Sequence, residues 1–599
     1  MKKRPLTTAP AADEEIDKSS LDVFGLLRRV FSYARPHARK RNHLIALVIF
    51  RSMGLPALAW AIGAIINGPI QHGDVGAILL ATLGFAALAA LVQFGFYFRI
   101  RLALELGEAV IHDIRNAVFA HLMRLPAGFY DRTKLGLIIG RMTSDLDAVR
   151  VGVQDIVFIS IVQGGNMIIA AVLMLWCDWV LFSIMLAIAP VIWLLNRYFT
   201  RRITDDQRRG QESFSRVTAT LAESVNGIRV TQGFVRQDVN ADSFRELVAD
   251  HSRYSLGAGQ TSAIFLPLLE LNSQFFIAML LVVGGYRTLN PEIARPVGDI
   301  VQFFFLSNLF FEPIKNLGSQ FTNALTAMVG AERVFRLLDT KPEWTDASGA
   351  WALPAIQGRV GFRHVTFGYD PAKPVLHDIT FTAEPGRTIA LVGHTGSGKT
   401  SIINLVAKMY LPTSGTLTID GHDILQVTSD SLHHQMAVVH QQNFLFEGTV
   451  LDNIRFARPG ASVQMVIETA RRLDCLDIID ALPRGLYTQV GEAGANLSAG
   501  QRQLVSFARA LMVDPRILIL DEATSAIDAM TEARIQRSLA TLLQGRTSFV
   551  VAHRLSTIRR ADLILVLDHG RIVERGTHAE LVRTGGIYAG LHGHFIRSA

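Results

Sequence analysis

Six long apolar segments in the first half of the chain restrict what that half can fold into. They cover residues 44–66, 76–98, 153–176, 179–199, 259–285 and 298–322. A helix needs about 20 mainly apolar residues to cross the roughly 30 Å hydrocarbon core of a bilayer. Because backbone polar groups inside a bilayer must be paired within the protein, such segments favour helices. The first half is therefore predicted to be an all-α domain with six membrane-spanning helices.

The composition of the whole chain agrees with this division. Hydrophobic residues make up 49% of 599 residues, and the mean hydropathy of +0.28 is high for a water-soluble protein. The excess precedes residue 325, whereas residues 340–599 have the pattern of a soluble α/β domain. The net charge of +7 is spread between the apolar segments, so we expect a lipid bilayer and no nucleic acid as partner.

Basic residues predict the orientation of the spans. The connections after the second and fourth segments are long and rich in arginine, whereas residues 67–75 and 177–178 contain no lysine or arginine. By the positive-inside rule, both termini and the second half of the chain are cytoplasmic, in a multi-pass protein of the inner membrane. The stretch Leu21–Tyr33 has an apolar stripe and is predicted to be an interfacial helix.

The second half contains a phosphate-binding loop. Residues 393–400 read GHTGSGKT, between a strand-like TIALVG and an apolar helix, which is the context that GxxxxGK[ST] requires. Backbone amides and one lysine of such a loop bind nucleotide phosphates. The residues predicted to bind ATP here are Gly393, His394, Thr395, Gly396, Ser397, Gly398, Lys399, Thr400 and Ser401.

An acidic pair follows a second buried strand. The apolar run ILIL precedes Asp521, which is predicted to hold Mg²⁺ together with the Thr400 hydroxyl. Glu522 is the candidate general base for the attacking water. The only cysteines, Cys177 and Cys475, lie in different halves, which argues against a disulfide framework.

The sequence LSAGQRQ at 497–503, between the phosphate loop and ILILDEATSAID at 517–528, completes a set that resembles the ATP-binding cassette (ABC) superfamily. Six spans followed by one cassette resemble a half transporter of the ABC exporter class, which includes multidrug and lipid exporters. The resemblance implies four regions: a polar tail at 1–20, a transmembrane domain at 21–338, a linker at 339–357 and an α/β cassette at 358–599.

The resemblance also implies roles for further residues. Tyr369 would stack on adenine, and Gln441 would contact Mg²⁺. His553 would contact the γ-phosphate and orient water, so that Glu522, His553, Lys399 and Gln441 form the catalytic set. Ser498, Gly500 and Gln501 would cap ATP bound by a partner cassette. Ala499 stands where the family usually has glycine, which predicts retained but slower ATP hydrolysis.

Two stretches resemble the intracellular loops of ABC exporters, in which short helices dock on the cassettes. They are residues 129–150 and 220–234, with the docking elements expected near Gly136–Thr143 and near Glu223–Arg229.

The predicted function is ATP hydrolysis coupled to export or flipping of amphipathic substrates, such as drugs or lipids, by alternating access. Because every motif is present, a homodimer is the simpler expectation, although a heterodimer would have the same motifs. An ATP-gated or regulatory membrane protein and an importer with the exporter fold are the alternatives. Seven polar residues lie within the predicted spans and could line a substrate path: Arg51, Gln163, Asn166, Glu270, Gln274, Asn308 and Glu312. The alternative is that Arg51 pairs with one of the glutamates and only holds helices together.

Overall fold

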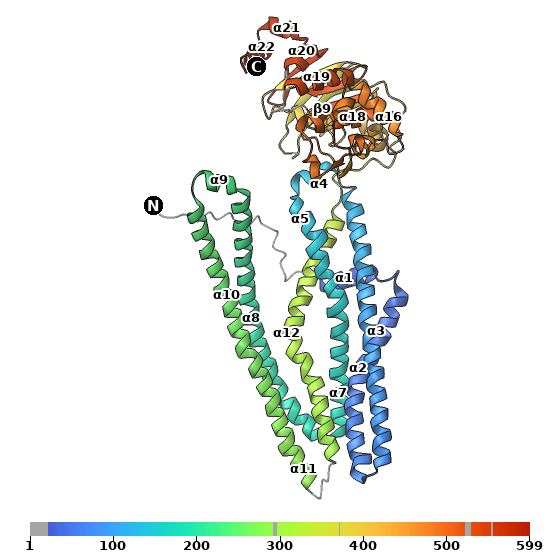
Figure 1. Cartoon of the computed structure of the whole chain (residues 1–599), viewed down its shortest axis with the longest axis vertical. Helices are drawn as coiled ribbons and strands as arrows, with labels where there is room; N and C mark the ends of the chain where they lie inside the picture. Colours follow the sequence, from blue (N-terminus) through green and yellow to red (C-terminus); the bar gives the residue numbers. More distant parts are fainter. Residues whose placement is uncertain (1–21, 291–295, 371, 522–528, 553–554, 599) are drawn as a thin grey trace. The chain divides into compact units, whose positions relative to one another are not determined.

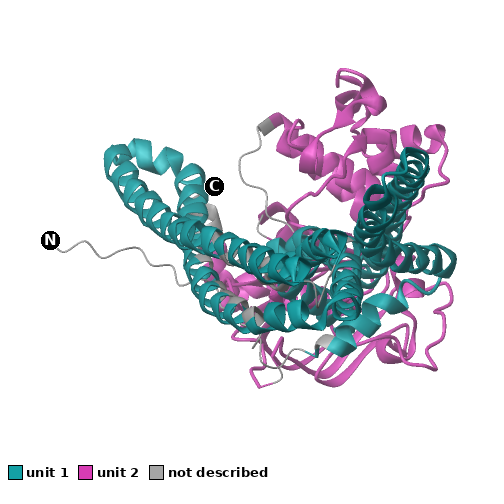
Figure 2. Ribbon diagram, turned by 90° about the horizontal axis from the view of Figure 1, so that it is seen from below, with its two compact units in different colours: residues 1–123, 135–340 teal, residues 124–134, 341–599 magenta. Residues whose placement is uncertain are grey.

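The computed structural model describes residues 22–290, 296–370, 372–521, 529–552 and 555–598 (Figure 1). They form two compact units, shown in different colours in Figure 2. The first unit contains residues 1–123 and 135–340, and the second contains residues 124–134 and 341–599. Residues 124–134, from the connection after the second predicted span, thus group with the cassette.

The first unit is built from helices throughout its described residues. They are α1 Val23–Ser32, α2 Ala38–Ile65, α3 Val75–Leu122, α5 Leu135–Gly140, α6 Leu146–Val151, α7 Val157–Cys177, α8 Trp179–Asn226, α9 Ile228–Gly233, α10 Gln237–Met279, α11 Gly285–Leu289 and α12 Val297–Asp339. Short π-helical segments continue α2, precede α6 and α7, and join α10 to α11.

Each predicted apolar segment lies within one of these helical stretches. In the described part of the chain, four stretches are long and apolar enough to cross a membrane: Ala38–Ile70, Val75–Leu122, Leu135–Cys177 and Val297–Ile314. Gln274–Leu289 is a shorter apolar helix, and the predicted segment 179–199 lies in α8. The domain is helical because these sequences can pair their backbone groups internally.

The longest helices exceed the length of a membrane span. α3 and α8 have 48 residues each, and α10 and α12 have 43 each. α8 and α10 pack against each other and are joined by α9 at one end of the pair (Figure 1). Because about 20 residues suffice to cross the bilayer, these helices extend beyond it.

The second unit contains two main sheets. The order of the six-stranded sheet is β12-β11-β3-β10-β9-β6, with β12 antiparallel and the other strands parallel. The antiparallel sheet has the order β2-β1-β4-β5, and β7 pairs with β8. The strands are β1 Val360–Phe367, β2 Leu376–Ala383, β3 Thr388–Gly393, β4 Ser414–Ile419, β5 His422–Asp423, β6 Met436–Val439, β7 Gly448–Thr449, β8 Gln489–Val490, β9 Ile517–Asp521, β10 Thr547–Val551, β11 Leu563–Asp568 and β12 Arg571–Gly576.

Helices cover the parallel sheet, whose central strands β3, β9 and β10 are apolar and buried, as parallel strands with two covered faces are. The α-helices of this unit are α4 Ala127–Arg132, α13 Lys399–Val406, α14 Ser429–His433, α15 Val450–Arg455, α16 Val463–Arg472, α17 Leu476–Asp480, α18 Ala499–Met512, α19 Ala529–Leu543, α20 Leu555–Arg560, α21 His578–Thr584 and α22 Ile587–Ser598. Ligands of open α/β sheets bind at the carboxyl ends of the strands. β3, β10 and β9 are parallel neighbours in the sheet, so the residues that follow the three strands lie at the same carboxyl edge.

Candidate functional site

The phosphate loop connects β3 to α13. Gly393 and Gly398 have φ angles of 155° and 102°, which favour glycine. A side chain at Gly393 would place its Cβ 2.2 Å from the carbonyl oxygen of Leu567, so the loop can pass this strand only with glycine. Lys399 is 8% exposed, and its Nζ donates to the carbonyls of Gly393 and His394 at 2.8 Å each. Burial lowers the pKa of Lys399 from 10.5, and the Asp521 carboxylate opposes this shift.

The remaining loop residues differ in exposure. Ser397 is buried, whereas His394, Thr395 and Thr400 are exposed. Ser401 is buried in the first turn of α13 and hydrogen bonds to Tyr369. The loop therefore presents its rim to solvent and anchors its end in the core.

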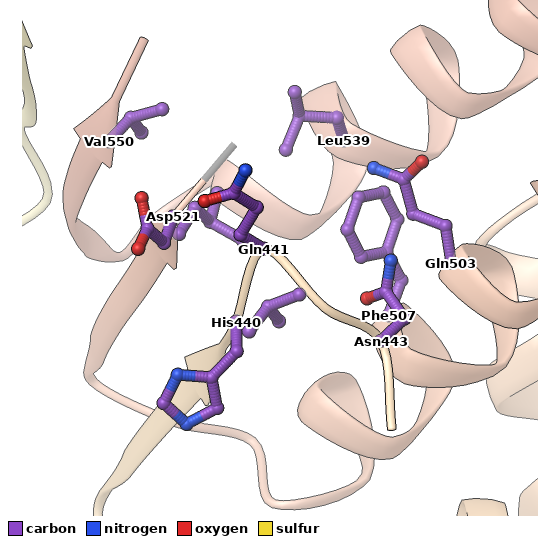
Figure 3. A pocket seen from close by; sticks show the side chains of 10 residues that line it. His440, Gln441, Asn443, Gln503, Phe507, Asp521, Leu539 and Val550 are labelled. Carbon is purple, nitrogen blue, oxygen red and sulfur yellow. The ribbon is translucent and has the colours of Figure 1, made fainter. Parts of the chain in front are cut away.

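Gln441 and Asp521 line the same pocket (Figure 3). Asp521 ends β9, and Gln441 follows β6, which pairs with β9 in parallel. The signature helix α18 contributes Gln503 and Phe507 to the pocket wall. Two of the three residues expected at the Mg²⁺ site are therefore brought together by neighbouring strands.

Three polar residues of this pocket were not predicted from the sequence: His440, Asn443 and Gln503. The Oδ1 atom of Asn443 and the Oε1 atom of Gln503 are buried and have no hydrogen-bond partner among the described residues. Both side chains line the pocket with Gln441. Asn443 lies two residues after Gln441, and Gln503 is the last residue of LSAGQRQ, so membership of these motifs is the only signal for them in the sequence.

Tyr369 lies beside the phosphate loop. Its hydroxyl is 3.2 Å from Ser401 Oγ and accepts a hydrogen bond of 3.4 Å from Asn404 Nδ2. Both partners belong to α13. Its ring makes an edge-to-face contact with Tyr410 at 5.0 Å between centroids. This places the aromatic side chain expected to stack on adenine next to the first turns of α13.

The signature sequence forms the start of α18. Ser498 caps the helix: its hydroxyl accepts from the amide of Gln501 at 3.2 Å, and the side chain of Gln501 accepts from the Ser498 amide at 2.9 Å. Gly500 is buried and Ala499 is exposed. The methyl group of Ala499 therefore points away from the core of its own cassette and leaves the capped helix intact.

Two predicted catalytic residues, Glu522 and His553, lie outside the described residues. In the sequence Glu522 follows Asp521, the last residue of β9, and His553 follows two residues after Val551, the last residue of β10. β9 and β10 are parallel neighbours in which Val551 pairs with Asp521. Their roles stay predictions, supported by this strand register.

The docking element of the first intracellular loop was predicted at the wrong residues. Gly136–Thr143 belongs to the first unit, whereas α4, which precedes it, packs with the cassette. Arg132 of α4 donates to the backbone carbonyl of Tyr369 at 2.8 Å and pairs with Glu343 at 2.7 Å. The expected element begins nine residues after the start of α4, at Gly136 instead of Ala127, because both segments have helical patterns and only the packing distinguishes them.

In the first unit, Arg51 does not pair with a glutamate in the described residues. Its guanidinium lies 4.5 Å from the centroid of Phe96 and donates weakly to the Val92 carbonyl at 3.5 Å. Asn166 is buried, and its Oδ1 has no partner within the described part of the chain. Among the described residues Arg51 thus contacts an aromatic ring and a backbone carbonyl of α3, and the two interpretations of its role stay predictions.

Comparison with known proteins covers both halves. Residues 43–314 match the family described as ABC transporter transmembrane region, and residues 376–525 match the family described as ABC transporter. The chain is 39% identical to the uncharacterized ABC transporter ATP-binding protein YknV of Bacillus subtilis, over 82% of this chain and 81% of that protein.

Two further relatives are similar over nearly the full length. The ATP-dependent lipid A-core flippase of Aromatoleum aromaticum is 36% identical, over 94% of this chain and 95% of that protein. The structure of a bacterial Atm1-family ABC exporter with ATP bound superposes with a TM-score of 0.78 at 27% identity, covering 93% of this chain and 98% of that chain. The chain thus belongs to the ABC transporter family, as an ATP-driven half transporter of the exporter type that joins a helical transmembrane domain to an ATP-binding cassette.

Proposed function

We propose that two copies of this chain form a transporter that uses MgATP to export or flip amphipathic or hydrophobic molecules across the inner membrane. The observation that carries the proposal is the fusion, in one chain, of a helical unit with membrane-spanning stretches and a cassette with one phosphate loop and one signature helix. A half transporter of this type works as a dimer, and the intact motifs favour identical subunits. Relatives named lipid A-core flippase and probable multidrug resistance transporter support lipids or drugs as the substrate class.

The residues of the phosphate loop fit a nucleotide with Mg²⁺. Lys399 is held at the loop by two carbonyls and can exchange them for β- and γ-phosphate oxygens. Thr400, Gln441 and Asp521 offer hydroxyl, amide and carboxylate oxygens, which are the ligands that Mg²⁺ prefers. When bound, Mg²⁺ neutralises charge on the phosphates. Tyr369 stacks on adenine beside α13.

Hydrolysis requires a base close to the γ-phosphate. Glu522 accepts a proton from the attacking water, and His553 holds that water in line. The parallel register of β9 and β10 supports the two residues at the same sheet edge.

The second half of each ATP site comes from the partner subunit. Ser498, Gly500 and Gln501 lie at the start of α18, a helix of 14 residues whose N-terminus favours anions. The Ser498 hydroxyl and the Gly500 amide bind the γ-phosphate held by the partner's phosphate loop. ATP binding thereby closes the cassette dimer, and hydrolysis releases it.

Exposed apolar surfaces support coupling between the subunits. At the tip of the α8–α10 pair, Phe234 and Val235 are 76% and 81% exposed. On the cassette, Phe444, Phe446 and Phe456 are also exposed. Contiguous exposed apolar surface marks interaction sites. The tip docks on the partner's cassette, near the expected element Glu223–Arg229, and moves with it.

The polar residues in the spans support a substrate path. Arg51 has a guanidinium that interacts with an aromatic face, and Asn166 keeps a buried acceptor without a partner among the described residues. Both groups can bind polar parts of an amphipathic substrate without breaking an ion pair. The arginine-rich connections support a cytoplasmic location of both termini and the cassette. A gating or regulatory role without transport is not favoured, because relatives of nearly equal length are named as flippases.

Glu522→Gln tests this function. Removing the base should abolish ATP turnover while ATP-bound dimers accumulate, because the amide keeps the shape of the site but cannot accept a proton. ATPase activity and retained nucleotide are measured on the purified transporter in lipid nanodiscs. Glu468→Gln, at an exposed position of α16, is the matched control and should keep wild-type activity. Undiminished turnover in Glu522→Gln would refute the assignment of the base.

A further inference from the structure

α4 packs against the part of the cassette that contains Tyr369, the residue proposed to stack on adenine. Ala127 lies against the core around the antiparallel sheet. A side chain at Gly128 would place its Cβ 2.7 Å from Glu343 Oε2 and 3.2 Å from Tyr410 Cε1. The helix backbone at Gly128 therefore lies close to both side chains, and a larger residue there would have to displace the end of Glu343.

Polar contacts fix the C-terminal end of α4. Asp131 accepts a hydrogen bond from the Tyr410 hydroxyl. Burial and this hydrogen bond raise the pKa of Tyr410 above its ordinary value, so its hydroxyl stays protonated as the donor. The Arg132 guanidinium has two partners: its Nη2 donates to the Tyr369 carbonyl at 2.8 Å, and its Nη1 pairs with Glu343 Oε1 at 2.7 Å.

Tyr369 is thereby held from two sides. Its carbonyl is bound by α4, and its hydroxyl is bound by Ser401 and Asn404 of α13. Tyr410, which Asp131 binds, also touches the Tyr369 ring edge-to-face. Tyr369, which is proposed to stack on adenine, is therefore held at both ends. Its backbone carbonyl is bound by α4 of the first intracellular connection, and its hydroxyl is bound by α13, the helix that follows the phosphate loop.

We propose that Arg132 is a positioning residue for the nucleotide base, acting through the Tyr369 carbonyl and linking the position of α4 to nucleotide affinity. The inference rests on the proposed stacking of Tyr369 on adenine. Because the base is common to ATP and ADP, Arg132 affects the binding of both nucleotides equally. By linkage, whatever moves α4 changes nucleotide affinity, and nucleotide binding holds α4 in place.

The experiment measures ATP and ADP dissociation constants of the full-length protein in nanodiscs, with Glu522→Gln present in every variant to prevent turnover. Arg132→Ala removes one hydrogen bond to Tyr369, so both constants should rise by about 3- to 10-fold. Arg132→Gln keeps one donor and should lose less. Glu343→Gln is the matched control: it removes the ion pair, leaves the bond to the Tyr369 carbonyl and should change affinity by less than about twofold.

A double-mutant cycle separates the base-positioning role from general support of the fold. In a Tyr369→Ala background there is no ring to position, so Arg132→Ala should have no added effect on either nucleotide. With Glu522 restored, Arg132→Ala should raise the KM for ATP more than it lowers kcat. Thermal unfolding is recorded for each variant, and Arg132→Gln replaces Arg132→Ala if the alanine variant is unstable.

The outcomes are distinguishable. Unchanged affinity in Tyr369→Ala would refute the adenine contact, and with it the basis of the inference. Weakened binding in Tyr369→Ala with unchanged binding in both Arg132 variants would overturn the inference alone. An Arg132 effect that persists without the Tyr369 side chain, or that is reproduced by Glu343→Gln, would also overturn it.

Discussion

At the scale of single residues, Cys475 illustrates how burial controls reactivity in the cassette. Its side chain is completely buried, and the thiol donates to the Ala470 carbonyl at 3.4 Å. Burial, followed by the nearby Asp477 and Asp474 carboxylates, raises the pKa of the Cys475 thiol to about 12. Because the thiolate is the reactive form, this cysteine is inert in the folded cassette.

We predict that Cys475 resists alkylation until the cassette unfolds. In a Cys177→Ser background, N-ethylmaleimide at pH 8 should label the folded protein negligibly and the denatured protein completely, as mass spectrometry can measure. Ser348→Cys, at an exposed position in a chain without native cysteines, should label at once. Rapid labelling of folded Cys475 would contradict the burial.

The same shift predicts a pH dependence of stability. The folded state raises the thiol pKa from 9.0 to about 12, so it favours the protonated thiol. The stabilisation is therefore complete below pH 9 and is lost as the pH rises from 9 towards 12. Thermal unfolding at pH 8 and pH 10 should show a smaller decrease for Cys475→Ala than for the parent protein. An equal decrease in unfolding temperature for both proteins would argue against the raised pKa of the Cys475 thiol.

At the scale of elements, the contact of α2 with α7 depends on small residues. A Cβ at Gly165 would lie 2.6 Å from the Cβ of Ser52, whereas a Cβ at Gly164 would meet nothing within 4 Å. The two adjacent glycines of α7 therefore differ in function: Gly165 permits close helix packing, and Gly164 does not touch a neighbour in its own chain. Small residues at helix interfaces are a general means of packing in membranes.

We predict opposite results for alanine at these two positions. Gly165→Ala should destabilise the transmembrane unit by about 1–2 kcal/mol, because overpacking outweighs the gain in helix propensity. Gly164→Ala should be neutral or slightly stabilising, as expected for glycine replaced by alanine in a helix. Fluorescence-monitored thermal unfolding compares the two variants. A lower unfolding temperature for Gly164→Ala alone would contradict the packing.

At the scale of the whole molecule, each chain supplies one phosphate loop and one signature helix. In the proposed dimer each ATP would contact Lys399 of one subunit and Ser498 of the other. In the proposed homodimer both composite sites would be equal. Ala499 leaves its own helix undisturbed, so we expect its effect on the rate of ATP hydrolysis to arise at the contact with the nucleotide of the proposed partner subunit.

Complementation tests the composite sites. Lys399→Ala and Ser498→Arg should each abolish ATPase activity as homodimers, since both sites are damaged in each. Co-expressed with different affinity tags and purified as mixed dimers, they should regain part of the activity, because one site then combines an intact loop with an intact signature. No recovery in mixed dimers would argue that both motifs serve the same nucleotide or that the sites do not act independently.

Local patterns in the sequence predicted much of this protein. Apolar segments of bilayer length predict helices because backbone groups cannot stay unpaired in lipid. The strand, glycine-rich loop and helix at 388–406 are contiguous, and so are the residues that shape the phosphate loop. The family resemblance rests on motifs of the same local kind. The roles of Glu522, His553 and the Mg²⁺ ligands stay predictions that the sheet register supports.

Contacts between distant parts of the chain were decided only by the tertiary structure. Arg132 and Tyr369 are 237 residues apart, and Asp131 and Tyr410 are 279 residues apart, so no local period could indicate that α4 binds there. The partner of Arg51 proved to be Phe96, because packing of α2 against α3 brings that ring within reach. The sequence by itself thus determined the helical transmembrane domain, the nucleotide motifs and the family. Only the tertiary structure identified α4 as the helix that packs with the cassette, and the side chains that surround each motif. These contacts join residues on different helices and sheets, so they depend on packing and not on local sequence.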